Sequence, residues 1–275
     1  ASIVGREDLI NGEIINLGTD EVHTTQEGID LVEEIMNKKL IIGSLFFVFL
    51  IVSCQKEVEK PKVIYDSSSK NTMAPKLDSS KVEIADLPVI MEGTDYLIHP
   101  IGDLRIYERG TKSKYGSSAV NDVSFTISNV AQYEITGFLQ NLKFQKIDSD
   151  SIHSLTDKPI LIETATYLKT VSDRIKKQIL VYTMVDADTN RDGKLDTNDI
   201  NTLYLSTISG EKFTKVATDL EELIDWNLIE ASNCLYFRTI EDTNKNGQFD
   251  QKDVLHYNYI DLNKNDWKVI RYSPI

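Results

Sequence analysis

A twelve-residue stretch, residues 188–199, has oxygen-bearing side chains at a spacing suited to a divalent cation. Positions 1, 3, 5, 9 and 12 of the stretch are Asp188, Asn190, Asp192, Asp196 and Asp199. Gly193 stands at position 6, where the chain must turn sharply, and Lys194 at position 7 offers its backbone carbonyl. A hard cation takes about six to eight oxygens, and alternate residues of a tight loop can point them inward. The stretch, which we call loop 1, therefore predicts a calcium site.

The same pattern recurs in residues 242–253, which we call loop 2. Its predicted ligands are Asp242, Asn244, Asn246, Gln248 through its carbonyl, Asp250 and Asp253, with Gly247 at the turn. We call the spacing between equivalent positions, such as 188 and 242, the repeat offset. The same spacing relates similar residues beyond the loops, for example Leu205 and Tyr259. Two such loops inside a longer repeat make a chance origin improbable. We therefore expect two related units, residues 178–216 and 232–270, with calcium as the cofactor.

The two loops differ in charge. Loop 1 has four carboxylates and loop 2 has three, with amides at Asn244 and Asn246. We therefore expect loop 1 to bind calcium more tightly than loop 2. Aspartate at position 12 reaches less far than glutamate, so we expect weak affinities, about 10⁻⁴–10⁻³ M or somewhat tighter. Sites of this kind act as structural clips outside the cytoplasm.

From residue 89 onward, short apolar segments alternate with polar residues, as at Val123, Phe125 and Ile127. Later segments of this kind span residues 160–167, 178–185, 203–208, 224–229, 235–240 and 256–262. A period of two with β-branched and aromatic enrichment is typical of strands. We expect a mostly β domain over residues 89–275, with each loop at a hairpin tip.

The repeat length suggests an architecture. When the twelve-residue loop is subtracted from the repeat offset, the remaining unit is close to the roughly 40–45 residues of a four-stranded propeller blade. The pattern around loop 1 resembles TolB-like β-propeller blades with inserted calcium loops; Tyr182, residues 188–193, Leu203, Tyr204, Ser206 and Gly210 carry it. The loops are also similar to those of EF-hands and dockerins, although a full helix follows the loop in those families. The resemblance implies propeller-like blade repeats, with a two-sheet β-sandwich as the alternative.

Residues 36–53 have the pattern of a secretory signal peptide, with two lysines followed by an apolar run over residues 40–52. That run is shorter than the roughly 20 residues of a membrane span. It ends in Ile-Val-Ser-Cys at residues 51–54, which resembles the lipobox of Gram-negative bacterial lipoproteins. The resemblance implies that Cys54 is acylated and holds the protein to outer-membrane lipid, on its periplasmic or cell-surface face. A plain signal-anchor helix is the alternative.

Residues 1–35 differ in character from the rest of the chain. Residues 14–19 and the helical pattern over residues 25–35 resemble a fragment of NAD-dependent nucleotide-sugar epimerases. The Gly-rich dinucleotide loop and the Tyr-x-x-x-Lys pair of that family are missing, so no epimerase activity is implied. We expect Met36 to be the native start and residues 1–35 to be an extraneous upstream or read-through segment.

Composition limits the partners. The chain of 275 residues has a formal charge of −13 and no basic stripe, which argues against a nucleic-acid partner. Residues 54–88 are rich in Lys, Glu, Ser and Pro, too polar to offset the entropy of ordering, and predict a flexible tether. The two cysteines provide no disulfide framework.

Catalytic machinery is not evident in the sequence. The four histidines, His23, His99, His153 and His256, are scattered, and neither His-Glu-x-x-His nor Gly-x-Ser-x-Gly occurs. We therefore predict no enzymatic activity. Trp226, Trp267, Tyr236, Tyr257 and Tyr259 fit core positions better than a glycan platform. The favoured function is a calcium-stabilised envelope lipoprotein that binds or scaffolds an envelope protein or glycan; a surface glycan-binding protein and a hydrolase with a propeller-like active face are the alternatives.

Overall fold

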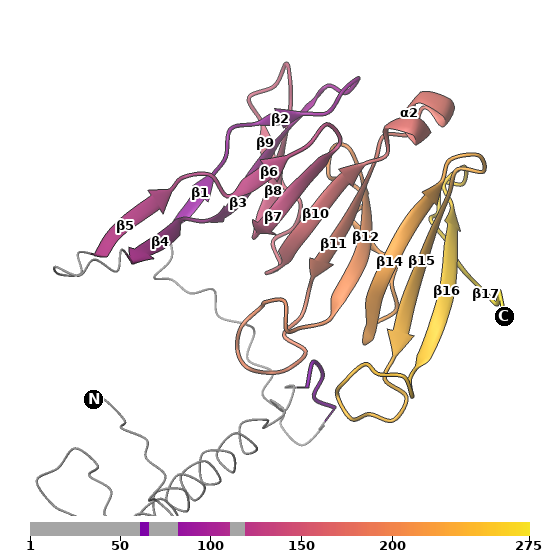
Figure 1. Cartoon of the computed structure of the whole chain (residues 1–275). Helices are drawn as coiled ribbons and strands as arrows, with labels where there is room; N and C mark the ends of the chain where they lie inside the picture. Colours follow the sequence, from indigo (N-terminus) through magenta and orange to yellow (C-terminus); the bar gives the residue numbers. More distant parts are fainter. Residues whose placement is uncertain (1–60, 66–81, 111–118) are drawn as a thin grey trace, which may run out of the picture. The chain divides into compact units, whose positions relative to one another are not determined.

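The computed structural model describes residues 61–65, 82–110 and 119–275, and the fold described below is that of these residues. They form three antiparallel sheets, none of which closes on itself, together with one short helix (Figure 1). The prediction of a mostly β protein is confirmed. The strands match the segments of period two, because side chains that alternate between two faces allow one face to be buried.

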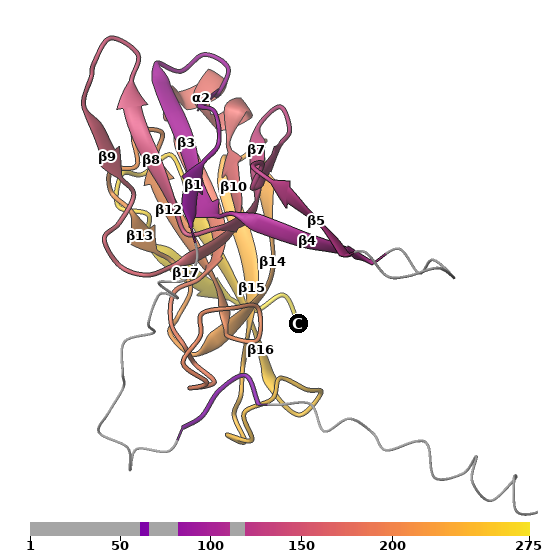
Figure 2. The same ribbon diagram turned by 90° about the vertical axis from the view of Figure 1, so that its left-hand side faces the viewer.

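The first sheet contains β1 (Glu83–Ala85), β2 (Val89–Ile90), β3 (Tyr96–Asp103), β8 (Asn141–Lys146) and β9 (Ile152–Ser154). A separate two-stranded ribbon, β4 (Arg105–Gly110) and β5 (Ala119–Ser124), extends from it (Figure 2). The second sheet contains β6 (Ser128–Val130), β7 (Glu134–Leu139), β10 (Leu161–Tyr167), β11 (Ile179–Val185), β12 (Asn201–Thr207) and β13 (Thr214–Lys215). The helix α2 (Lys169–Ile175) joins β10 to β11. The third sheet contains β14 (Glu221–Ile229), β15 (Cys234–Glu241), β16 (Val254–Asp261) and β17 (Val269–Tyr272).

The second sheet lies between the other two and is buried on both faces. On β11, Leu180 and Tyr182 belong to the core shared with Ile98 and Phe144 of the first sheet. The alternate residue Val181 belongs to a second core, shared with Leu235 of the third sheet. Full burial of such side chains is worth roughly 1.5–3 kcal/mol each. This explains why residues 179–182 are apolar without a break.

The second and third sheets meet through equivalent faces. The repeat offset matches Val181 to Leu235, and both point into the core between these two sheets. It also matches Tyr182 to Tyr236, and both lie on the face directed away from that core. Successive propeller blades are related by rotation about a central axis, which brings opposite faces together. Like faces in contact are compatible with the β-sandwich alternative, and no propeller closure is present among the described residues.

The two hairpins also differ in register by one residue. Val181 pairs with Leu205, whereas Leu235 pairs with Ile260, the residue after Tyr259. A slip of one residue turns the following side chains to the other face of a sheet. Leu205 is therefore buried, whereas Tyr259, its match at the repeat offset, lies beside Tyr236 on the outer face.

Both predicted calcium loops occupy hairpin tips, as expected. Loop 1 joins β11 to β12 and loop 2 joins β15 to β16. The two loops lie at the same end of the sheets, opposite α2 (Figures 1 and 2). Packing of the two hairpins against each other therefore brings the loops into proximity.

The buried face of β11 leads to a testable prediction. Tyr182 is fully buried, and its hydroxyl and that of Ser206 are 2.7 Å apart and share a hydrogen bond. Tyr182→Phe should lower the free energy of unfolding by about 1 kcal/mol, since a buried hydrogen bond is lost. Tyr236→Phe, at the equivalent outer position, should change it by less than about 0.5 kcal/mol. Urea denaturation of both variants measures the difference, and equal effects would contradict the assignment of faces.

Candidate metal centre

The predicted ligands of loop 1 are held by backbone N–H groups of the loop itself. The carboxylate of Asp188 accepts hydrogen bonds from the N–H groups of Asp192 at 3.1 Å and Gly193 at 2.9 Å. Asp199 accepts from Thr189 at 2.8 Å and, through its other oxygen, from Asp196 at 3.1 Å. The carboxylates at positions 1 and 12 therefore hold the loop backbone in place through hydrogen bonds from its N–H groups.

Loop 2 repeats these hydrogen bonds at equivalent atoms. Asp242 accepts from Asn246 at 3.2 Å and from Gly247 at 2.7 Å. Asp253 accepts from Thr243 at 3.1 Å and from Asp250 at 2.8 Å. The repeat offset therefore holds at the level of individual hydrogen bonds within the loops.

The remaining ligand positions follow the same rule. The side-chain oxygens at positions 3 and 5 accept from the N–H groups two residues further on, through Asn190 and Asp192 in loop 1 and Asn244 and Asn246 in loop 2. The oxygens at position 9, of Asp196 and Asp250, also accept from the N–H groups two residues further on. The residues at position 7, Lys194 and Gln248, donate the N–H groups that position 5 accepts.

The backbone turns in the same way in both loops. Arg191 and Lys245 at position 4 have φ of 58° and 56°, and Gly193 and Gly247 at position 6 have φ of 83° and 81°. Positive φ is favourable only for glycine, so the glycine at position 6 is explained by its conformation. The sequence indicated the glycines but gave no sign of the two strained residues at position 4.

The predicted ligands differ in burial. Asp199 and Asp242 are buried, whereas Asp192 and Asn246 are exposed. Burial raises the pKa of the Asp199 carboxyl above its usual range, although the N–H groups from which it accepts hydrogen bonds act in the opposite direction. A nearby cation would stabilise the ionised form of this buried carboxylate.

The carboxylates alone do not form a compact group in either loop. Among the described residues, no three carboxylates of either loop have oxygens that all lie within 4.8 Å of one another. Oxygens on opposite sides of one calcium ion would be about 5 Å apart, since each is roughly 2.3–2.6 Å from the ion, and amide and carbonyl oxygens also serve as ligands. The oxygen-bearing residue types at the six positions of each loop are those that calcium takes.

A short segment far away in the sequence lies against both loops. The carbonyl of Gly247 accepts the N–H groups of Lys62 at 2.7 Å and Val63 at 3.3 Å. The carbonyl of Thr189 in loop 1 accepts the N–H of Ile64 at 3.0 Å, and the Thr189 hydroxyl donates to the Lys62 carbonyl at 2.7 Å. Residues 61–65, which we call the bridging segment, therefore connect loop 1 to loop 2 (Figures 1 and 2).

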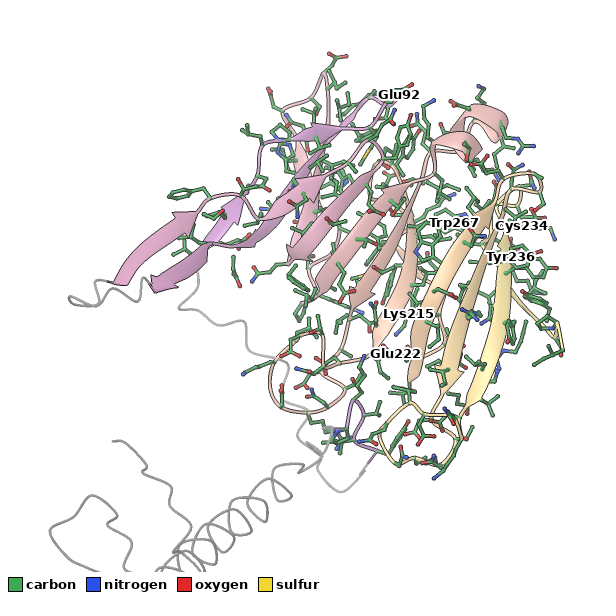
Figure 3. The ribbon with its side chains drawn as sticks, in the orientation of Figure 1. Glu92, Lys215, Glu222, Cys234, Tyr236 and Trp267 are labelled. Atoms are coloured by element: carbon green, nitrogen blue, oxygen red, sulfur yellow. The ribbon has the colours of Figure 1, made fainter. Side chains whose placement is uncertain are left out.

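Side chains strengthen this contact. Val63 is 3% exposed, and the Lys62 ammonium forms an ion pair with Glu222 at 2.7 Å, at the end of the third sheet near the loops (Figure 3). Burial raises the pKa of Glu222 even though Lys62 lowers it. Burial, and then the neighbouring charge of Asp242, raise the pKa of Tyr65 to about 12. Sequence analysis does not predict this contact, because residues 54–88 are too polar to indicate burial.

Another group of potential metal ligands lies on the third sheet. The ligand atoms of Glu221, Glu241 and His256 all lie within 4.8 Å of one another, with 2.8 Å between His256 Nε2 and Glu241. Thr239 donates to one oxygen of Glu221, and Arg271 donates to the other at 2.9 Å. Both oxygens of this buried carboxylate therefore accept hydrogen bonds from protein donors, and Arg271 already offsets its negative charge. The register of adjacent strands brings these three residues together. Their scattered positions in the sequence do not indicate such a group.

The other candidate catalytic residues are not brought together. The ring of His153 contacts the Ser209 carbonyl at 2.7 Å, and His99 contacts Gln145 at 3.1 Å. The Cys234 thiol lies 3.6 Å from the Ser232 carbonyl, with which it forms a weak hydrogen bond. A hollow of about 1040 Å³ lies between the first two sheets and loop 1, and its described lining contains no histidine or cysteine.

The buried end of loop 1 supports a prediction that does not depend on calcium. Asp199→Ala should leave the N–H groups of Thr189, Asn190 and Asp196 without their acceptor. The free energy of unfolding should fall by about 1–3 kcal/mol, because unsatisfied buried donors are costly. Asp192→Ala, at an exposed position, should cost less than about 1 kcal/mol. Urea denaturation in excess chelator measures both, and an equal loss would contradict the role of Asp199.

Several predictions concern residues outside the described ranges: the segment 1–35, the signal peptide 36–53, acylation of Cys54 and most of the tether 54–88. Within the described ranges, no helix is long and apolar enough to cross a membrane. Comparison with protein-family models, curated proteins and solved structures finds no match to this chain.

Proposed function

We propose that this protein is a calcium-binding lipoprotein of the bacterial outer membrane, in which calcium stabilises a binding or scaffold domain. The observation that carries the proposal is the atom-by-atom repetition of the hydrogen bonds in loops 1 and 2. A twelve-residue pattern can arise by chance, but its repetition with the same positive φ at positions 4 and 6 favours one common ligand. Oxygen ligands of this kind suit calcium.

The proposed role of calcium is structural. Loop 1 contains four carboxylates and loop 2 contains three, so each loop concentrates negative charge at a hairpin tip. An ion of charge +2 would offset this repulsion and draw the side chains to one centre. The acylated Cys54 would attach the domain to the outer membrane, and the partner would be an envelope protein or a glycan.

Calcium binding can be tested through its effect on the melting temperature. Saturating calcium should raise the melting temperature by about 10–20 °C, because an ion at 100 times its Kd stabilises the fold by about 2.7 kcal/mol at each of the two sites. Asp188→Asn should reduce this shift more than Asp242→Asn, since loop 1 has the higher charge. Differential scanning calorimetry with calcium and with chelator measures the shift.

The control for this experiment is His256→Gln, which alters the Glu221, Glu241 and His256 group without touching either loop. It should leave the calcium shift unchanged. A melting temperature that does not respond to calcium, or a response lost only in His256→Gln, would refute calcium binding at the loops.

A specific observation also supports the glycan-binding alternative. Tyr236, Tyr257, Tyr259 and Tyr272 gather on the outer face of the third sheet, with ring centroids of Tyr236 and Tyr259 5.4 Å apart and those of Tyr236 and Tyr272 5.6 Å apart. No other described element covers this face (Figure 1). Arg238 and Asp225 form an ion pair on the same face. Partly exposed aromatic rings beside polar groups suit a sugar ring better than an apolar ligand.

The glycan alternative makes a separate prediction. Tyr259→Ala combined with Tyr272→Ala should abolish binding on a glycan array while the far-ultraviolet circular dichroism spectrum stays unchanged. Trp226→Ala is the control for packing, because Trp226 contacts the core between the second and third sheets. It should lower stability and keep glycan binding at temperatures where the variant is folded. Absence of any glycan signal for the unmodified protein would remove this alternative.

A further inference from the structure

The bridging segment, residues 61–65, occupies a surface that both loops form together. It donates backbone hydrogen bonds to Thr189 of loop 1 and to Gly247 of loop 2, and its Val63 side chain is buried. Backbone bonds to both loops and a buried apolar side chain are features of specific recognition of an extended peptide. The chain's own segment therefore occupies this surface in the way that an extended peptide would.

Both residues whose backbone carbonyls accept hydrogen bonds from the segment are also bonded to a predicted calcium ligand. The N–H of Thr189 donates to Asp199, and its carbonyl accepts from Ile64. The N–H of Gly247 donates to Asp242, and its carbonyl accepts from Lys62 and Val63. The position of both carbonyls therefore depends on carboxylates that would bind the ion.

The bridging segment contacts only one of the two glycines at position 6 of the loops. A Cβ atom added to Gly247 would lie 2.5 Å from the Val63 carbonyl oxygen and 2.6 Å from Pro61 Cβ. A Cβ atom added to Gly193 would have nothing within 4 Å. The two glycines share the same backbone conformation, so they form a matched pair that differs in contact with the segment.

We infer that the bridging segment docks across the two loops when they hold calcium and is released when calcium is removed. This inference rests on the proposed calcium binding. Without the ion, mutual repulsion of the loop carboxylates loosens the turns that present the Thr189 and Gly247 carbonyls. Linkage is reciprocal, so docking of the segment also strengthens calcium binding.

Hydrogen–deuterium exchange of the full chain in detergent, with calcium ions or with chelator, tests the inference. The reporters are the amides of Lys62, Val63 and Ile64, which donate the bridging hydrogen bonds. In calcium their exchange should be at least about tenfold slower than in chelator, since closed amides exchange only through opening. Val63→Asp should abolish this protection, whereas Ile64→Asp, at a position that is 38% exposed, should keep it.

Two further measurements distinguish failure of the docking inference from failure of the proposed calcium binding. At calcium concentrations that saturate each variant, Gly247→Ala should lose the protection and Gly193→Ala should keep it. Titration calorimetry should show that Val63→Asp weakens calcium binding by about fivefold or more. In one outcome, calorimetry records heat of calcium binding while the amides of residues 62–64 exchange equally fast in calcium and in chelator. That result would overturn the docking inference alone. No heat on adding calcium would overturn both this inference and the proposed function.

Discussion

The apolar contact between β11 and β15 is the interaction on which the rest of the structure depends. Val181 and Leu235 are both fully buried in the core between the second and third sheets. Because β11 and β15 run in the same direction in neighbouring sheets, the tips of the two hairpins lie at the same end of the sheets (Figure 1). Two acidic loops that are a full repeat apart in the sequence therefore contact a single short segment. Hydrophobic burial fixes the position of the polar site.

The loops show how a fold can concentrate negative charge. Each buried end carboxylate, Asp199 in loop 1 and Asp242 in loop 2, accepts hydrogen bonds from backbone N–H groups. Such bonds offset part of the desolvation of a charged group, but they do not remove repulsion between neighbouring carboxylates. The divalent ion that we propose for each loop would offset this repulsion.

A change of one residue in register distinguishes the two hairpins and gives the third sheet its partly exposed tyrosines. In the second sheet, the face with Tyr182 is covered by the first sheet. In the third sheet, no described sheet covers the equivalent face, and the slip adds Tyr259 to it. The aromatic cluster is therefore a product of where the stack of sheets ends and how one hairpin pairs. Neither property is visible in a sequence alignment of the two repeats.

The sequence by itself determined the strands, the hairpin position of loops 1 and 2, and the twelve ligand candidates, because these depend on local periodicity and on fixed spacing within a turn. It did not determine the face on which Tyr236, Tyr257 and Tyr259 lie, and the prediction that they occupy core positions is wrong, since face depends on register and on the neighbouring sheet. It also gave no indication of the Glu221, Glu241 and His256 group or of the contact made by residues 61–65. These arise only when distant segments pack together, and packing geometry is decided by the tertiary structure rather than by local residue preferences.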